Sequence, residues 1–351
     1  MFNSSNLVTN KIPATSITND NDWLLEIKHA IKDLDTLAKK LNLNLTSVLT
    51  GKHAHKAFQL MVPMPYLERI EKGNLNDPLL RQILPIDEEM KQVKGYVTDP
   101  LAELDHNPKK ALVHKYSSRI LVITSGSCAI NCRYCFRRHF PYANNHLAPA
   151  EWDSLLSYIQ THPQINEVIL SGGDPLMMKD KQLSQLISRL EALPQLKRLR
   201  IHTRLPIVIP SRINNELLNW ASQTRLKVIM VLHINHANEI DGKVIEACSK
   251  LAKIGVRLLN QGVILKNVND TAEAQIALSE ALFDADILPY YMFTLDPVEG
   301  ASHFDITIDQ AQQLMGQVAA NLPGYLVPKL AKEIPGKTAK TLFAPTLANS
   351  N

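Results

Sequence analysis

The feature that most constrains the fold is an alternation of short apolar runs with helical segments from residue 120 onward. Six runs have the composition of strands: 120-ILVIT, 167-EVILS, 198-RLRIH, 228-VIMVL, 256-VRLLN and 288-LPYYMF. We expect helices in the intervals, over residues 152–159, 181–190, 214–221, 242–251 and 271–283. After the first gap the runs recur about every 30 residues, the size of one βα unit. Continuous apolar strands are typical of a parallel sheet, so the chain is α/β, either an open doubly wound sheet or a barrel.

Polar residues gather after these runs, and their positions favour the barrel. They are Cys128, Cys132 and Cys135 after the first run, Ser171, Gly172, Gly173 and Asp174 after the second, His233, Asn235 and His236 after the fourth, Asn260 and Gln261 at the end of the fifth, and Asp296 after the sixth. In β/α barrels the carboxyl ends of the strands carry the chemistry. We therefore predict a six-strand partial (β/α) barrel over residues 111–300, with the candidate ligands on one face.

The flanking regions and the composition complete the domain prediction. We expect a poorly ordered tail over 1–20, an N-terminal helical region over 21–110, and a C-terminal segment over 301–351. One amphipathic helix from Trp23 to Leu37, with Asn21 or Asp22 as N-cap, should open the helical region. The net charge of +4 is too small to indicate nucleic-acid binding. No stretch has the pattern of a membrane span or a signal peptide, so we expect a cytoplasmic protein.

Three of the four cysteines stand close together with the spacing C-x3-C-x2-C, at Cys128, Cys132 and Cys135. Three thiolates can ligate three irons of a [4Fe-4S] cluster and leave the fourth iron open. The alternative is a zinc site completed by His139 or Cys248. Zinc motifs usually bring their ligands as two separated pairs, and only one group is present here, so the spacing favours the cluster.

This cysteine spacing, with Tyr134 before the last cysteine, resembles the signature of the radical S-adenosylmethionine superfamily. The 171-SGGD segment after the next strand is similar to that family's glycine-rich loop. The resemblance implies that Ser171, Gly172, Gly173 and Asp174 pair with the amino group of S-adenosylmethionine, which binds the open iron. Without this context, a Gly-Gly-Asp sequence is typical of a simple turn.

Within that superfamily the chain resembles the lysine 2,3-aminomutases from about residue 115 to 341. The matching segments are 115-KYSSRILVIT, 132-CRYCFRRHF, 168-VILSGGDPL, 233-HINHANE, 260-NQGVILKNVND, 289-PYYMFTLD and 335-PGKTAKT. The resemblance implies pyridoxal 5'-phosphate bound as a Schiff base to Lys340, with Lys337 as the alternative. It also implies that Lys115, Tyr116 and Arg119 surround the phosphate. Lys115 departs from the family's arginine and loses the bidentate guanidinium.

The same resemblance assigns the substrate contacts. Arg137 stands where these enzymes bind the amino-acid carboxylate, and Asp296 and Glu333 stand where they bind the side-chain amine of lysine. Two carboxylates select a cation, so the expected substrate is L-lysine. His233, Asn260 and Gln261, with Asn235 and His236, should line the nucleoside side of the cavity. For His233 an equal alternative is a strand-end histidine hydrogen-bonded to backbone.

The expected reaction is the radical conversion of L-lysine to β-lysine, because moving an amino group between carbons has no easy acid–base route. It needs an electron donor for the cluster. The chain ends eleven residues after Lys340 and has Thr271 where longer catabolic members carry a zinc-binding cysteine. It thus resembles the branch that makes (R)-β-lysine for a ligase to attach to elongation factor P.

Three alternatives remain at this point. One is a free-standing aminomutase that supplies β-lysine for catabolism, osmoprotection or antibiotic synthesis. Another is an iron–sulfur or zinc protein that binds RNA through Arg133, Arg137 and Arg138, which the lack of a basic stripe disfavours. The third concerns assembly, since the chain can be a monomer or a homo-oligomer.

Overall fold

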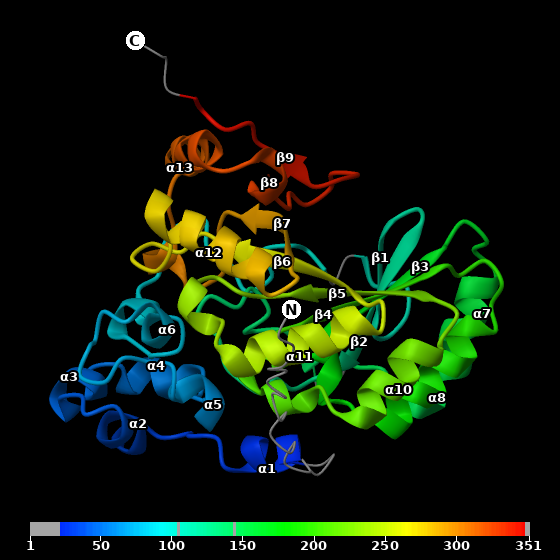
Figure 1. Cartoon of the computed structure of the whole chain (residues 1–351), viewed down its shortest axis with the longest axis horizontal. Coiled ribbons are helices and arrows are strands. Elements are labelled where there is room, and N and C mark those ends of the chain that lie inside the picture. The colour runs from blue at the N-terminus through cyan, green and yellow to red at the C-terminus, as the bar shows by residue number, and fades with distance from the viewer. Residues whose placement is uncertain (1–21, 104–105, 143–144, 348–351) are drawn as a thin grey trace, which may run out of the picture.

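A sheet of nine strands forms the centre of the described chain (Figure 1). This computed structural model describes residues 22–103, 106–142 and 145–347, so the predicted tail over 1–20 and the proposed cap Asn21 lie outside it. The strands are β1 (Leu112–Tyr116), β2 (Arg119–Ser125), β3 (Glu167–Gly172), β4 (Arg198–Thr203), β5 (Lys227–Leu232), β6 (Arg257–Val263), β7 (Leu288–Phe293), β8 (Lys329–Lys332) and β9 (Thr341–Leu342).

The helices of the described chain fall into an N-terminal group and a group that alternates with the strands. The first group is α1 (Asp22–Lys28), α2 (Leu34–Lys40), α3 (Leu45–Leu49), α4 (Lys52–Ala57), α5 (Met64–Leu67) and α6 (Pro78–Arg81). The second group is α7 (Trp152–Gln160), α8 (Asp180–Glu191), α9 (Leu205–Val208), α10 (Asn215–Gln223), α11 (Gly242–Lys253), α12 (Ala272–Asp284) and α13 (Ile308–Asn321). None of the described helices is both long enough and apolar enough to cross a membrane.

The strands follow one another across the sheet in chain order, from β1 to β9. Strands β2 to β8 are parallel, while β1 and β9 pair antiparallel with β2 and β8. Strand β3 is buried along its whole length, as expected for a parallel strand covered on both faces. The described strands do not close into a ring, because β1 and β9 stay at opposite edges. The predicted partial barrel is confirmed.

The sheet is wider than the six strands that the sequence indicated. The six predicted runs correspond to β2 through β7. Strand β8 escaped prediction because its sequence, KLAK, is short and has a lysine at each end. It nevertheless pairs with β7, from Tyr291 opposite Lys329 to Phe293 opposite Ala331. The sheet therefore continues past the predicted boundary at residue 300 and includes the C-terminal segment.

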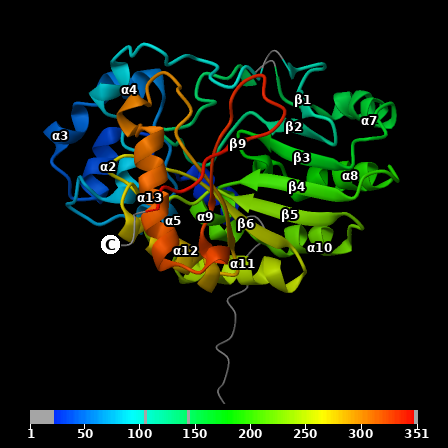
Figure 2. The same cartoon turned by 90° about the horizontal axis from the view of Figure 1, so that it is seen from above.

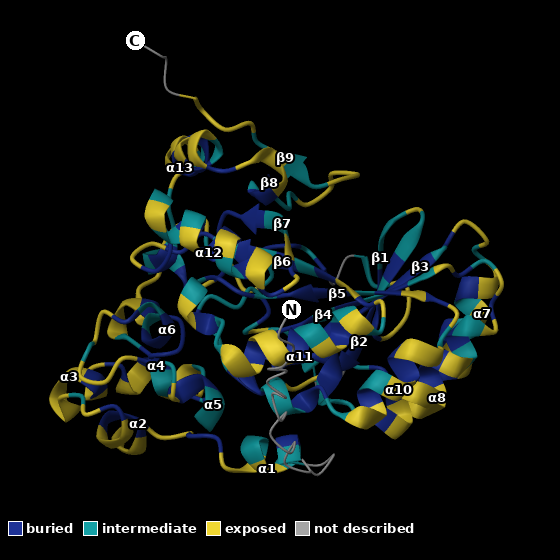
Figure 3. Cartoon of the chain, in the orientation of Figure 1, coloured by how far each residue is buried: buried dark blue, intermediate teal, exposed yellow. Residues whose placement is uncertain are grey.

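Amphipathic helices cover the outer face of the sheet, with α7, α8 and α10 along one side (Figure 2). In α8 the buried residues Leu183, Leu186, Ile187 and Leu190 recur at helical spacing and form one apolar stripe. The helices accordingly show a buried and an exposed face in Figure 3. All five intervals that predicted a helix contain one, at α7, α8, α10, α11 and α12.

The single N-terminal helix predicted from Trp23 to Leu37 is wrong. The chain forms two helices, α1 and α2, separated by an extended stretch in which Ile31 makes a bridge with Val62. Asp33 then caps α2 by accepting a hydrogen bond from the Thr36 amide. The apolar spacing is real, since Trp23, Ile31 and Leu37 are all buried, but a cap inside the repeat starts a new helix.

Candidate active site

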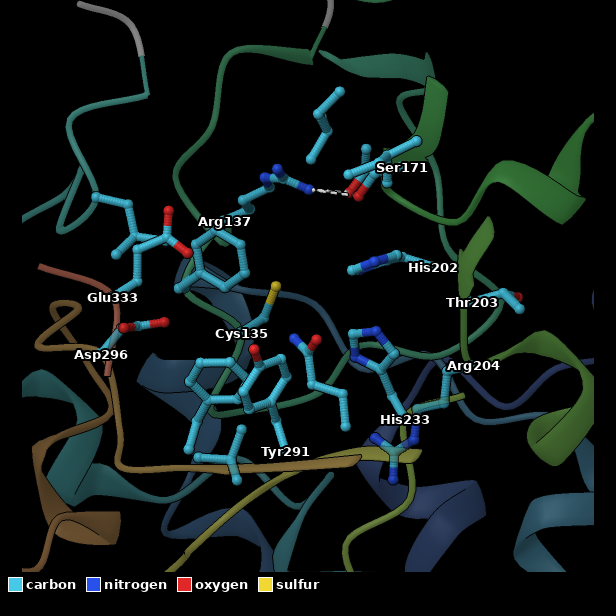
Figure 4. A pocket seen from close by; sticks show the side chains of 18 of the residues that line it. Cys135, Arg137, Ser171, His202, Thr203, Arg204, His233, Tyr291, Asp296 and Glu333 are labelled. Atoms are coloured by element: carbon cyan, nitrogen blue, oxygen red, sulfur yellow. Dashed lines mark hydrogen bonds between the residues drawn. The ribbon is translucent and has the colours of Figure 1, made fainter. Parts of the chain in front are cut away.

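One cavity of about 570 Å³ opens at the carboxyl ends of the parallel strands. Its walls contain most of the residues singled out in the sequence: Cys128, Cys132, Cys135, Arg137, Ser171, Gly172, Gly173, Asp174, His233, Gln261, Asp296, Lys115, Tyr116, Arg119, Glu333 and Lys340. In the view of Figure 4, Glu333 and Asp296 lie to one side of Cys135, and His202, Thr203 and Arg204 lie to the other. We call the part around the three cysteines the cysteine end, and the part around Lys340, Glu333 and Asp296 the lysine end.

The cysteine loop follows β2 and is fixed from behind by the N-terminal region. The Arg133 guanidinium donates to both carboxylate oxygens of Glu89 and to the carbonyl of Phe58. Arg138 donates to the same Glu89 carboxylate. Arg133 is fully buried, so it is a structural anchor of the loop. The helical region over 22–103 thus positions the cysteines.

The three cysteines are half-buried free thiols that line one wall. Burial raises the pKa of the Cys128 thiol, and the charges of Cys135 and Cys132 raise it further. Burial likewise raises the pKa of Cys135 to about 11. Thiols that oppose each other's ionisation in this way fit a shared cationic group, which would stabilise all three thiolates. Among the described residues, no group of three or more Cys, His, Asp or Glu side chains is arranged so that it could hold a single metal ion.

The glycines of the 171–174 segment let the end of β3 approach the cysteine loop. Gly172 has φ of +121°, and a Cβ there would meet the Ser125 carbonyl oxygen at 2.5 Å. A Cβ on Gly173 would meet the Ser127 carbonyl oxygen at 2.3 Å. Both positions therefore require glycine. Asp174 accepts hydrogen bonds from the Thr203 hydroxyl and from the Arg204, Leu205 and Leu176 amides, so its carboxylate joins β3 to β4.

Arg137 lies where the two ends of the cavity meet, and the carboxylate of Glu103 forms an ion pair with it. Its Nε and Nη2 donate to the two oxygens of Glu103, each at 2.7 Å, and Nη1 donates to Ser171 Oγ at 3.0 Å. Both side chains of the ion pair are buried. Ala102, just before Glu103, has φ of +47°, which is uncommon for a residue other than glycine. Glu103 thus occupies the face of Arg137 that would bind a substrate carboxylate.

The lysine end is formed where side chains of β1 contact Glu333, the residue after β8. Lys340 Nζ donates to Glu333 Oε2 at 2.5 Å, and the other oxygen of Glu333 accepts from Tyr116 at 3.3 Å. Lys115 lies 3.6 Å from Glu333 and donates to the Leu101 carbonyl. Burial alone would raise the pKa of Glu333, but the charges of Lys340 and, to a smaller extent, Lys115 outweigh burial and lower the pKa. Lys340 lines the cavity, whereas Lys337 is exposed and does not.

Asp296 completes the lysine end with an unsatisfied carboxyl group. Its Oδ1 is buried and has no hydrogen-bond partner among the described residues. Burial, followed by the nearby charge of Glu333, raises the pKa of Asp296 to about 7. A cationic ligand between Asp296 and Glu333 would supply the missing partner and favour the ionised form.

Aromatic and basic side chains cover the lysine end beside Lys340. The Arg119 guanidinium lies 3.9 Å from the centre of the Tyr116 ring, and the ring of Tyr291 stacks obliquely on Tyr290. Burial raises the pKa of Tyr291 to about 12, although the nearby charges of Arg119 and Arg200 lower it in part. Both arginines line the cavity. Aromatic rings close to arginine side chains fit an aromatic ligand that bears an anionic group.

The predicted nucleoside residues divide into two groups. His233 and Gln261 line the cavity, and His233 Nε2 is buried with no partner in the part of the chain described. Asn260, Asn235 and His236 are outside the lining. The Asn260 amide bonds the backbone of Ile234, and Asn235 accepts from the Val263 amide. Their side chains hold the strand ends in place.

Sequence reasoning missed several lining residues, although a signal was available for some. His202 and Thr203 end β4, Arg204 follows it, and all three line the cavity beside the cysteines. The rule that identified the other strand ends applies to them equally, because their run, 198-RLRIH, was recognised as a strand. Glu103 had no such signal, since it lies far from any strand and reaches the cavity only through its tertiary contact with Arg137.

Comparisons with known proteins agree with this arrangement. Residues 122–215 match the model of the radical SAM superfamily. The chain is 49% identical to the L-lysine 2,3-aminomutase of Escherichia coli K12, over 91% of this chain and 94% of that protein. It is 49% identical to the L-lysine 2,3-aminomutase of Haemophilus influenzae, over 93% and 97%, and 32% identical to that of Clostridium subterminale, over 93% and 78%. At these identities and coverages, the chain belongs to the L-lysine 2,3-aminomutase family of radical SAM isomerases.

Proposed function

We propose that this enzyme moves the α-amino group of L-lysine to the β-carbon and forms (R)-β-lysine. The observation that carries the proposal is the single cavity that joins three free cysteines to Lys340, two carboxylates and a buried arginine. As a radical SAM enzyme of this family, the chain uses a [4Fe-4S] cluster and S-adenosylmethionine. Cys128, Cys132 and Cys135 would hold the cluster at the cysteine end.

Pyridoxal phosphate fits the lysine end. Lys340 would hold its carbonyl carbon, and Arg119 and Lys115 would face its phosphate. When bound, the three cofactors together supply a hydrogen-abstracting radical and a π-system through which an imine nitrogen can move. Lys340 must give up a proton before its amine can act as a nucleophile. Glu333, at 2.5 Å from Lys340 Nζ, is placed to take part in that transfer.

The carboxylates of the lysine end support a substrate with a cationic side chain. In the structure Lys340 pairs with Glu333, so a lysine ε-ammonium already has a favourable site there. Asp296 offers a second carboxylate without a partner among the described residues. A substrate with an acidic side chain would meet repulsion from both groups. We therefore assign Asp296 and Glu333 to the substrate ε-ammonium and Arg137 to the substrate carboxylate.

The destination of the product is the finer part of the proposal. We propose that the (R)-β-lysine is passed to a ligase that attaches it to elongation factor P. The chain is markedly more similar to the Escherichia coli protein than to that of Clostridium subterminale, at 49% against 32% identity, which supports a branch distinct from the latter. The competing role is a supply of free β-lysine.

The reaction is tested by anaerobic incubation with L-lysine, S-adenosylmethionine, pyridoxal phosphate and a one-electron reductant, followed by chiral separation of the lysine isomers. We expect (R)-β-lysine and 5'-deoxyadenosine. Formation of 5'-deoxyadenosine without β-lysine, across several amino acids, would contradict the proposed substrate. Absence of both products from protein with a full cluster would contradict the proposed reaction.

The biological role needs a separate measurement. Deletion of the gene should remove the β-lysyl mass from elongation factor P, and (R)-β-lysine added to the medium should restore it. If the modification persists in the deletion strain, the product serves the free β-lysine pool instead.

A further inference from the structure

Arg204 is a buried cation at the cysteine end with no place in the proposed reaction so far. It directly follows β4, and its side chain is 7% exposed. Its Nη1 donates to Cys132 Sγ at 2.7 Å and to the Tyr134 hydroxyl oxygen at 2.8 Å. A charged N–H donor therefore points at the sulfur of one of the three cysteines.

The guanidinium is held in this position from the opposite side. Its Nη2 donates to Glu239 Oε2 and to Gln82 Oε1, each at 2.8 Å. Both partners are fully buried, and the Asn235 amide donates to the other oxygen of Glu239 at 2.9 Å. Arg204 is thus fixed by its own partners and needs no contribution from the sulfur. A donor fixed in advance does not reorganise when charge develops next to it.

The other arginines near the cysteines have different orientations. Arg133 and Arg138 both point back to Glu89. Arg137 points across the cavity to Glu103 and Ser171. Among the described residues, Arg204 is the arginine that donates a hydrogen bond to a cysteine sulfur of this loop.

Hydrogen bonds to the sulfurs and nearby charge are two of the factors that set the reduction potential of an iron–sulfur cluster. Reduction by one electron adds negative charge to the cluster and its thiolates. A fixed cation within hydrogen-bond distance stabilises that reduced form more than the oxidised form, and burial keeps water from screening it.

We propose that Arg204 is a positioning residue that raises the reduction potential of the cluster by donating to the sulfur of Cys132. An external one-electron donor supplies the electron, and Glu239 limits the size of the effect by partly neutralising the guanidinium. This inference depends on the cluster and not on the amino-acid substrate. It can therefore fail while lysine turnover is confirmed, or hold while the proposed substrate is wrong.

The test is an anaerobic redox titration of cluster-loaded wild type and Arg204→Met, followed by the electron paramagnetic resonance signal of the reduced cluster. Iron and sulfide are counted in each sample. We expect the potential of Arg204→Met to be more negative, by about tenfold in the reduction equilibrium, which corresponds to about 59 mV for one electron. Arg204→Lys, which keeps the charge without the guanidinium, should fall between the two.

Arg212→Lys is the matched control, because Arg212 is also a buried arginine but pairs with Asp180 outside the cavity. If Arg204→Met does not retain its cluster, Glu239→Gln replaces it in the test. That variant removes the counter-charge and should shift the potential in the positive direction. A potential equal to the control in Arg204→Met, or in Glu239→Gln where that variant is used, overturns the proposal, as does a shift of opposite sign.

Discussion

The cysteine end and the lysine end share one cavity, but the chain builds them in different ways. At the cysteine end the three cysteines lie within eight residues of one another, and the contact from Arg204 to Cys132 spans 72 residues. At the lysine end Tyr116 meets Glu333 across 217 residues. The side chains of Lys340 and Glu333 also remain 22% and 18% exposed, whereas those of Arg204 and Glu239 are 7% and 0% exposed.

This difference separates a part that is fixed from a part that can exchange partners. Arg204 and Arg133 have partners on several sides, so the cysteine end is rigid before any ligand binds. At the lysine end Glu333 is shared by Lys340, Lys115 and Tyr116, and Asp296 has an oxygen without a partner in the described chain. A ligand can change these pairings without disturbing the sheet. We infer that radical formation depends on the rigid end and substrate choice on the adjustable end.

The largest effect is expected from breaking the cysteine end itself. Replacing Cys128, Cys132 or Cys135 with Ala should remove the visible absorbance of the cluster and all turnover, because in the proposed site each thiolate ligates one iron. Cys248→Ala is the control, since that cysteine is buried in α11 away from the cavity. A single variant with full iron content and normal turnover would contradict the assignment.

The second effect separates the two ends. Lys340→Ala should lose the pyridoxal phosphate absorbance and β-lysine formation while keeping the cluster spectrum, because the ends do not share residues. The exposed Lys337→Ala should behave like wild type. If Lys337→Ala loses the cofactor and Lys340→Ala keeps it, the two lysines have been assigned in the wrong order.

Arg137 and Glu103 test the boundary between the ends. Each charge-assisted hydrogen bond contributes about 1.5–3 kcal/mol, so Arg137→Lys should raise KM for lysine by about 10- to 100-fold. Glu103→Gln should lower KM by up to about tenfold, since it weakens the internal carboxylate that competes for Arg137. Steady-state kinetics with saturating cofactors measures both. A raised KM in Glu103→Gln would show that Glu103 orients Arg137 rather than competing with the substrate.

The smallest effect is the pH dependence of the lysine end. Because the pKa of Asp296 is raised to about 7, kcat/KM for lysine should fall by about fivefold from pH 7 to pH 6 as the carboxyl group protonates. In the absence of ligand the raised pKa costs folding stability as pH rises from 3.8 to about 7. Asp296→Asn should therefore gain thermal stability over wild type across that interval. An equal difference in Tm at pH 5 and pH 7.5 would contradict the raised pKa.

The two ends also differ in how far the sequence predicts them. Strands β2 to β7 and the cysteine loop follow from local patterns, namely apolar runs of strand length and the spacing of three cysteines. The position of Lys340 followed only from family resemblance, because a lysine in a short polar segment has no local signal. Strand β8 and the bond from Arg137 to Glu103 depend on tertiary pairing that no periodicity reports. The break between α1 and α2 was missed because a cap at Asp33 interrupted an otherwise helical repeat.

Strands β8 and β9 have a consequence for the order in which the enzyme matures on the ribosome. Chains are made from the N-terminus, so later segments become available for folding only after earlier ones. The cysteine loop and strands β2 to β7 all precede β8 and Lys340 in the chain. A nascent chain therefore contains all three cysteines before Lys340 has been synthesised, so the lysine end is the last part of the cavity that can be completed.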